Sequence, residues 1–289
     1  MKKVYVVYNP LAGNGKCNDI VEKLLQFVKD EAVRWDMTKN NSYGELAAAL
    51  GDEDYIILVG GDGTLNRFVN DAGDVKFNCE ILYLPGGSGN DFAHDIGVTA
   101  DGEPTSITKY LCDLPTVEVN GNTYKFINGV GYGIDGYCCE EGDRLRQIPD
   151  AKIDYTAIAI KGLLFKYKPT AAKVTVDGKE YNYKKVWIAP TMNGRFYGGG
   201  MMPTPAQERL GDDKRLSVMI FHGSGKLKTL MIFPSLFKGE HIKHTKHVEV
   251  LLGKEITVEF DSPRALQVDG ETMLGVTSYT AKVKVPAKV

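Results

Sequence analysis

The chain lacks a long hydrophobic run and has no strong excess of charge of either sign. Its apolar stretches, such as Tyr55–Val59, are far shorter than the roughly 20 residues that a membrane-spanning helix needs. The 35 Lys and Arg residues nearly balance the 37 Asp and Glu residues, which gives a net charge of −2. Charge therefore gives no sign of a nucleic-acid partner. We expect a soluble protein with no membrane-spanning segment and no nucleic acid bound.

Cysteine is scarce and irregularly spaced, which excludes two further classes of protein. The five cysteines are an odd number and form no CxxC pair: Cys17, Cys79, Cys112, Cys138 and Cys139. This usage fits reduced thiols in the cytoplasm and neither a disulfide framework nor a zinc site. With 43% hydrophobic and 25% charged residues, the chain has the composition of a globular protein.

The first 115 residues alternate between strand and helix patterns. A continuous apolar run such as Tyr55–Val59 is typical of a strand buried on both faces. The expected strands are Val4–Tyr8, Val33–Met37, Tyr55–Val59 and Glu80–Leu84, and the expected helices between them include Asp19–Asp30, Tyr43–Leu50 and Leu65–Ala72. Such alternation predicts an α/β domain over residues 1–115, with an open, mainly parallel sheet and flanking helices.

After Pro115 the pattern changes to repeated short strands with hairpin signals, of which Asp177-Gly178 is the clearest. One clear helix is expected at about Ile153–Tyr167 and a second at Lys226–Phe237. These patterns predict a β-rich, β-sandwich-like domain over residues 116–277. We also expect the last residues, about 278–289, to return to the first domain.

Three glycine-rich turns follow the strands of the first domain: Asn9–Gly13, Gly60–Thr64 and Pro85–Asp91. Ligands of open α/β sheets bind beyond the carboxyl ends of the strands, where glycines let the backbone approach phosphates and a helix N-terminus favours negative charge. The alternative is that each is only a tight strand-to-helix turn. That alternative is weaker for three turns that each carry a polar group.

Asp62 is the most informative residue of these turns, because packing does not explain a carboxylate between two glycines. It could hold Mg²⁺ directly or through water, or bind a substrate hydroxyl. Thr64 could cap the helix or contact a phosphate. A P-loop is excluded, because Pro10 stands where its first glycine would be and Cys17 where it needs Ser or Thr. No GxGxxG follows a strand.

These segments resemble the catalytic domain shared by diacylglycerol kinases, sphingosine kinases and related bacterial lipid kinases. The resemblance rests on the three turns and continues through Asn128–Asp135, Asn193–Met201 and Gln267–Glu271, in order along nearly the whole chain. NAD kinases also carry Gly-Gly-Asp-Gly-Thr, but the Ser-Gly-Asn-Asp and Val-Asp-Gly-Glu elements favour the lipid kinases.

The resemblance implies an ATP- and Mg²⁺-dependent kinase that phosphorylates a hydroxyl of a diacylglycerol-like membrane lipid. Asp62 would act in catalysis, with Glu271 as the general base and Asp269 close to it. The ATP-binding residues would be Asn9, Gly13, Gly61, Gly63, Thr64, Asn66, Gly87, Ser88, Gly89 and Asn90. A structural Mg²⁺ would be bound by Asp213 and by the carbonyl groups of Leu210 and Arg215.

Two positions depart from the family pattern. Arg67 stands where the family usually has Glu, and the usual Asp-Gly-x-Leu-Asp segment becomes Asp213-Lys-Arg-Leu-Ser217. We therefore keep two alternative functions: an NAD kinase-like small-molecule kinase, and an ATP-binding protein without catalysis.

The expected partners are ATP and a lipid acceptor at the membrane surface, with a homodimer left open. The resemblance implies a cytoplasmic enzyme in peripheral contact with the inner face of the membrane. The segment Lys161–Lys168 mixes cations with apolar side chains. It could rest on an anionic membrane, or it could be a core-facing helix end with solvated lysines.

Overall fold

The computed structural model describes residues 2–148 and 153–284 and divides the chain into two compact units, Met1–Asp113 and Leu114–Val289. The division lies close to the boundary expected between residues 115 and 116. No described helix is long and apolar enough to cross a membrane. We describe each unit separately.

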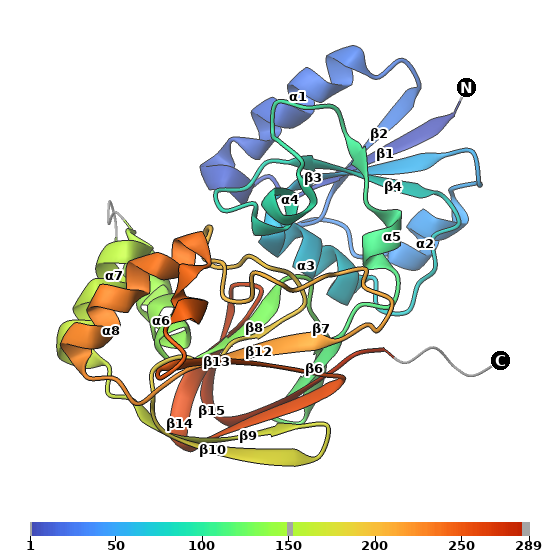
Figure 1. Ribbon diagram of the computed structural model, residues 1–289. Helices are drawn as coiled ribbons and strands as arrows, with labels where there is room; N and C mark the ends of the chain where they lie inside the picture. The colour runs from blue at the N-terminus through green and yellow to red at the C-terminus, as the bar shows by residue number, and fades with distance from the viewer. Residues whose placement is uncertain (1, 149–152, 285–289) are drawn as a thin grey trace. The chain divides into compact units, whose positions relative to one another are not determined.

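Unit 1 is built on a five-stranded sheet in the order β2-β1-β3-β4-β5 (Figure 1). The first four strands are parallel, and β5 runs antiparallel to β4. The strands are β1 (Lys3–Tyr8), β2 (Glu31–Asp36), β3 (Tyr55–Gly60), β4 (Glu80–Pro85) and β5 (Thr105–Ser106). Ile56 to Val59 are all buried, as a strand covered on both faces requires. The mainly parallel α/β domain predicted from the sequence is thus confirmed.

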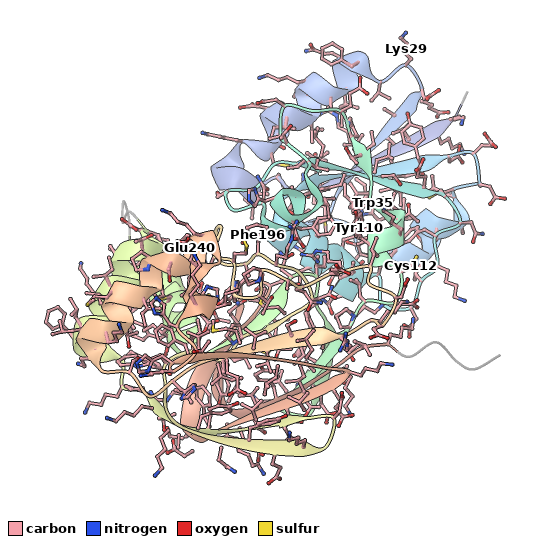
Figure 2. The ribbon with its side chains drawn as sticks, viewed as in Figure 1. Lys29, Trp35, Tyr110, Cys112, Phe196 and Glu240 are labelled. Atoms are coloured by element: carbon pink, nitrogen blue, oxygen red, sulfur yellow. The ribbon has the colours of Figure 1, made fainter. Side chains whose placement is uncertain are left out.

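The connections of unit 1 are helical: η1 (Ala12–Gly15), α1 (Cys17–Phe27), α2 (Tyr43–Ala48), α3 (Asp62–Asp71), α4 (Asp91–Ile96) and α5 (Thr108–Leu111). Helix α3 begins at Asp62 and not at Leu65, so Asp62, Gly63 and Thr64 form its first turn. Aromatic rings pack between the elements. The ring centroids of Trp35 in β2 and Tyr5 in β1 lie 6.2 Å apart, and Trp35 is labelled in Figure 2.

Unit 2 contains a ten-stranded antiparallel sheet in the order β13-β12-β11-β8-β14-β15-β6-β7, with the β9-β10 hairpin joined to β14. Its strands are β6 (Thr116–Val119), β7 (Asn122–Lys125), β8 (Gly129–Tyr132), β9 (Thr170–Val176), β10 (Lys179–Val186), β11 (Thr191–Met192), β12 (Leu216–Phe221), β13 (Val248–Gly253), β14 (Glu255–Val268) and β15 (Glu271–Lys282). The first half of β14 pairs with β9 and its last residues with β8, with a register shift after Glu259. A strand that changes partners in this way lets the sheet fold over its own core.

The helices of unit 2 gather beside this sheet: α6 (Ile134–Arg146), α7 (Tyr155–Lys161), the π-helical turn η2 (Gly162–Lys166), α8 (Lys226–Ile232), η3 (Phe233–Lys238) and η4 (Glu240–Lys243) (Figure 1). The sequence did not predict α6. Two glycines inside it, Gly136 and Gly142, disfavour helix. The structure explains Gly136, because a Cβ there would collide with the carbonyl group of Ala265 in β14.

The expectation that residues 278–289 return to the first domain is wrong for the residues that the structure describes there. Tyr279 to Lys282 form the end of β15 and pair with β6, while the same strand pairs with β14 on its other side. The buried side chains of Tyr279 and Ala281 are part of the core of unit 2. This burial holds the segment in unit 2. Residues 285–289 lie outside the described part.

Candidate active site

The three glycine turns of unit 1 meet at the carboxyl end of its sheet. The amide of Gly86 donates to the carbonyl oxygen of Gly60 at 2.8 Å. A Cβ at Gly61 would lie only 2.7 Å from the Cα of Gly87, and a Cβ at Gly13 would collide with the carbonyl oxygen of Gly86. The turns pack backbone against backbone, which is why glycine is needed at these positions.

Asp62 joins the second turn to the third. Its two carboxylate oxygens accept hydrogen bonds from the backbone amides of Asp91 at 3.0 Å and Phe92 at 2.8 Å. Asp62 thereby satisfies the first amides of α4, a structural role that the sequence did not reveal. A carboxylate oxygen is also the kind of ligand that Mg²⁺ prefers.

The third turn is fixed by Asn90, whose backbone is left-handed with φ of 54°. Its side-chain oxygen accepts from the amide of Gly87, and its side-chain nitrogen donates to the carbonyl oxygen of the same residue, both at 2.9 Å. Ser88 and Gly89 form the exposed tip of the turn between them. Asn90 is therefore a brace for the turn, and the tip is left accessible.

Gly63 differs from the packed glycines of the three turns. No atom outside its own neighbourhood lies within 4 Å of where its Cβ would be, and the residue is exposed in the first turn of α3. Thr64 beside it is buried and packs against Gly60, so its position fits the structural alternative better than a phosphate contact. The protein itself gives no steric reason for glycine at residue 63. A ligand at the N-terminus of α3 would give one.

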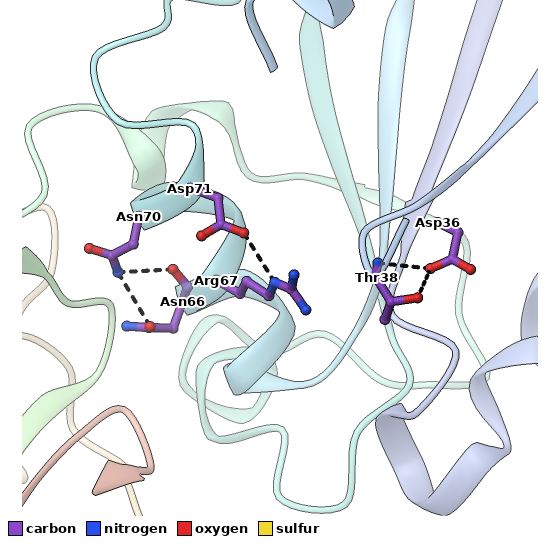
Figure 3. Close-up of polar contacts among 6 residues, drawn as sticks. All are labelled: Asp36, Thr38, Asn66, Arg67, Asn70 and Asp71. Atoms are coloured by element: carbon purple, nitrogen blue, oxygen red, sulfur yellow. Dashed lines mark hydrogen bonds and ion pairs between the residues drawn. The ribbon is translucent and has the colours of Figure 1, made fainter. Parts of the chain in front are cut away.

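Asn9, Asn66 and Arg67 complete the predicted set in unit 1. The side chain of Asn9 accepts from the amide of Leu11 at 3.0 Å and shapes the first turn. Asn66 is buried on α3 and accepts from Asn70 at its carbonyl and side-chain oxygens (Figure 3). Arg67 forms an ion pair with Asp71 one turn further along α3, at 3.0 Å. The reversed charge at Arg67 is thus partly compensated within the same helix.

The position of Cys17 agrees with the exclusion of a P-loop. The thiol lies in the core and donates to the carbonyl oxygen of Val59 at 3.4 Å. Burial raises the pKa of the Cys17 thiol to about 11, so the thiol stays protonated at neutral pH. It does not supply the oxygen ligand that a P-loop serine or threonine gives.

In unit 2, Asp269 and Glu271 lie on the hairpin between β14 and β15. Asp269 and Gly270 both have positive φ, 47° and 98°, as the two central residues of a type I′ turn require. The Asp269 carboxylate accepts from the amides of Ile127 at 2.5 Å, Asn128 at 2.8 Å and Gly129 at 2.9 Å. Asp269 therefore ties the hairpin to the start of β8, and the exposed Glu271 stands beside this fixed point.

The expected structural metal segment does not have the contacts of a metal site. The exposed Asp213 carboxylate pairs with the Arg215 guanidinium at 3.2 Å. The carbonyl oxygen of Arg215 accepts from the side-chain amide of Gln207 at 2.8 Å, and the side chain of Leu210 is exposed. Two of the three expected ligand groups are thus engaged within the protein, with cationic side chains beside them. These contacts do not support the metal site expected at Asp213, Leu210 and Arg215, which stays a prediction.

Asp135 is a buried carboxylate that the sequence did not single out. It lies in the first turn of α6, where the Tyr197 hydroxyl donates to its Oδ2 at 3.1 Å. A Cβ at Gly131 would collide with this oxygen. Burial raises the pKa of the Asp135 carboxyl to about 6, although hydrogen bonds from Gly136, Tyr197 and others lower it. Its place among the alternating glycines Gly129, Gly131 and Gly133 is the signal that could have identified it.

The fold and the site define a class of protein: an α/β unit whose glycine turns meet beyond its parallel strands, followed by an antiparallel β unit. The model of the diacylglycerol kinase catalytic domain matches residues 3–120, and the model of the YegS C-terminal NAD kinase beta sandwich-like domain matches residues 128–288. The second match alone covers more than half of the chain. The chain belongs to the diacylglycerol kinase family of lipid kinases and is a kinase.

Two relatives carry kinase names from this family, and a solved structure shares the fold. A diacylglycerol kinase of Mycobacterium tuberculosis is 25% identical over 276 residues, which cover 89% of this chain and 85% of the relative. A Bacillus subtilis protein named "Putative lipid kinase YtlR" is 25% identical over 243 residues, which cover 78% of this chain and 75% of the relative. A solved Bacillus anthracis structure titled as a "putative diacylglycerol kinase" superimposes with a TM-score of 0.67 at 21% identity, covering 100% of this chain and 97% of that one. The resemblance inferred from the sequence is confirmed.

Proposed function

We propose that this enzyme transfers the γ-phosphoryl group of ATP to a hydroxyl of a membrane lipid, with diacylglycerol as the first acceptor to test. The observation that supports it best is the convergence of three glycine turns around Asp62, with Gly63 left open at the N-terminus of α3. Backbone amides at such a helix end bind phosphate. The membership of the chain in the lipid kinase family supports the lipid acceptor.

The phosphates would lie against the three turns, close to Gly63 and the exposed tip at Ser88 and Gly89. Asp62 would hold the catalytic magnesium with its carboxylate, which also keeps α4 in place. Magnesium, when bound, neutralises charge on the β- and γ-phosphates. The packed glycines Gly13, Gly61 and Gly87 would hold the turns in register.

In unit 2 we propose Glu271 as the general base and Asp269 as the residue that positions it. The bond between the γ-phosphorus and the β–γ bridging oxygen breaks as a bond forms from that phosphorus to the lipid oxygen. ADP leaves, and the hydroxyl proton passes to the Glu271 carboxylate. Asp269 would not accept this proton, because its carboxylate is held by three backbone amides.

The proposed location is peripheral, at the inner face of the membrane, because the proposed acceptor is a membrane lipid. ATP and the lipid would then be the two substrates.

The test is incubation of the purified chain with γ-labelled ATP, Mg²⁺ and mixed micelles of a panel of single lipids, with NAD⁺ as a separate acceptor. Label in one lipid class, lost in both Asp62→Asn and Glu271→Gln, supports the proposal and names the acceptor. Label on NAD⁺ alone would assign an NAD kinase activity instead. ATP binding without transfer to any acceptor would contradict the proposal.

A further inference from the structure

The β14–β15 hairpin is held firmly at the residues that precede Glu271. The Asp269 carboxylate accepts from three backbone amides, and the amide of Gly270 donates to the side-chain oxygen of Gln267 at 2.6 Å. Glu271 then begins β15. Across the described residues, no hydrogen bond or ion pair engages the Glu271 carboxylate itself. The backbone on its two sides therefore decides where this carboxylate lies.

The residue after Glu271 is tied to helix α6. The Thr272 hydroxyl donates to the Asp143 carboxylate at 2.6 Å, although the two residues are 129 positions apart in the chain. A hydrogen bond to a charged acceptor is shorter and roughly twice as strong as one between neutral groups. Because Thr272 follows Glu271 directly in β15, this contact limits the movement of the Glu271 backbone. The hairpin is thus held both before and after the proposed base.

Helix α6 is a rigid support for this contact. It packs against β14 and β15 (Figure 1), and Gly136 lets it lie directly against the carbonyl group of Ala265. Near the other end of the helix, a Cβ at Gly142 would collide with the ring of Tyr155 in α7. Such close packing on two sides leaves α6 little freedom to shift relative to the hairpin.

The Asp143 carboxylate is oriented by Arg146, which lies one turn further along α6. The Arg146 guanidinium pairs with Oδ1 of Asp143, and the Thr272 hydroxyl engages Oδ2. The other terminal nitrogen of Arg146 donates to the Tyr155 hydroxyl at 2.8 Å, which joins the pair to α7. An exposed ion pair contributes little to stability by itself. Its effect is therefore expected in the orientation of Asp143.

We propose that Asp143 is a positioning residue for phosphoryl transfer, which acts through Thr272 to hold Glu271 where a lipid hydroxyl can reach its carboxylate. A general base works only within hydrogen-bond reach of the proton that it accepts. A displacement of about 1 Å can cost roughly a hundredfold in rate. The inference rests on the proposed function, because it needs Glu271 as the base.

The test compares Thr272→Val with Thr280→Val, because valine keeps the branched shape of threonine and removes the hydroxyl. Thr280 lies near the other end of β15, where its hydroxyl is 2.9 Å from that of Thr257. With γ-labelled ATP and diacylglycerol in mixed micelles, Thr272→Val should lower kcat roughly tenfold and leave KM for ATP unchanged. Thr280→Val should change neither, and Thr272→Ser, which restores the hydroxyl, should restore kcat. Equal kcat in the two valine variants would overturn the proposal.

Double variants separate positioning from a role in the fold. Asp143→Ala should lower kcat as Thr272→Val does, and the two together should cost no more than either alone, because they break one contact. In the Glu271→Gln background, Thr272→Val should have no further effect on kcat, since no base remains to be misplaced. A further loss in that background would show that Thr272 acts on the fold and not through Glu271.

Hydrogen exchange, measured without substrates, tests the same contact apart from catalysis. The amides of residues 271–274 should exchange faster in Thr272→Val than in the parent protein, whereas those of residues 127–129, which Asp269 holds, should not change. Full activity in Glu271→Gln would refute the proposed base. An inactive Glu271→Gln beside a fully active Thr272→Val would refute the positioning role alone. Unchanged exchange at residues 271–274 would overturn the inference whatever the acceptor proves to be.

Discussion

At the scale of single residues, Gly61 and Gly63 have different reasons to be glycine, although they flank the same aspartate. Gly61 packs against the backbone of Gly87, whereas nothing in the protein opposes a side chain at Gly63. Gly61→Ala should therefore destabilise unit 1, by about 1–3 kcal/mol for an overpacked contact. Gly63→Ala should change the affinity for the ligand without lowering the stability of the fold.

Gly63→Ala should leave the free energy of unfolding unchanged or slightly raised, because alanine favours helix and has room in the first turn of α3. The affinity for ATP should fall roughly tenfold or more, since the new methyl group occupies the space of the phosphates. Isothermal titration with ATP and urea unfolding measure the two effects. Gly44→Ala on α2, where space is also open, is the matched control and should leave ATP affinity unchanged. Unchanged affinity in Gly63→Ala would place the phosphates elsewhere.

Asp135 gives unit 2 a stability that depends on pH. Folding raises the pKa of this carboxyl from 3.8 to about 6, so the folded state binds the proton more tightly than the unfolded state. The stability that the protonated Asp135 carboxyl contributes to the folded state is complete below pH 4, and it is lost as the pH rises through 6. The shift corresponds to a cost of roughly 2–3 kcal/mol at neutral pH.

Asp135→Asn should therefore become more stable relative to the parent protein between pH 4.5 and pH 7, because the amide mimics the protonated acid. Urea unfolding of both proteins at the two pH values measures this change, with the exposed Asp101→Asn as control. A difference in stability that stays constant with pH would show that Asp135 does not titrate in this range.

At the scale of elements, the β14–β15 hairpin carries two residues with different roles. Asp269 holds the hairpin in place, and Glu271 is the proposed general base. Asp269→Ala removes three hydrogen bonds to backbone amides and should lower the free energy of unfolding by about 2–3 kcal/mol. It should also lower the rate of transfer, because Glu271 loses its fixed position. Asp177→Ala is a close match, since Asp177 begins another Asp-Gly turn and accepts from the amides of Lys254 and Glu255 at 2.8 Å. It should lower stability and leave the activity per folded molecule intact. Equal activity per folded molecule in both variants would remove Asp269 from the site.

The sequence predicted most elements of unit 1 because short apolar runs, of which Tyr55–Val59 is the clearest, alternate with amphipathic helical segments. It missed the start of α3 because Gly61 and Gly63 resemble a loop, while Asp62 in fact lies in the first helical turn. Helix α6 was missed for a related reason, since Gly136 disfavours helix locally but allows close contact with β14. Tertiary packing decides both cases, and the local helix propensity of the residues gives no information about that packing.

The candidate site was predictable to a different degree in each unit. Motif spacing correctly brought the three glycine turns together, because parallel strands end at one edge of a sheet. Spacing could not reveal that Asp62 also caps α4 or that Asp269 clamps β8. Spacing also could not show that the Arg215 guanidinium forms an ion pair with the Asp213 carboxylate. These are contacts between residues far apart or flexible side chains, which have no sequence signature.

At the scale of the whole molecule, the proposed function divides the work of the enzyme between the two units. Under this proposal, unit 1 would supply the turns that bind phosphate, and unit 2 would supply the hairpin with Glu271. The family assignment agrees with this division, because one family model matches each unit. Loss of either function should abolish lipid phosphorylation without unfolding the other unit.

The most direct measurement is the initial rate at which label from γ-labelled ATP enters diacylglycerol in mixed micelles, for the parent protein and for Asp62→Asn. The substitution keeps the size of the side chain and one oxygen for the amides at the start of α4, so the folded fraction can be matched by circular dichroism. The account predicts labelled lipid with the parent protein and at least a roughly hundredfold lower rate with Asp62→Asn. Labelled lipid formed at equal rates by both proteins would contradict the assignment of the three-turn site as the centre of phosphoryl transfer.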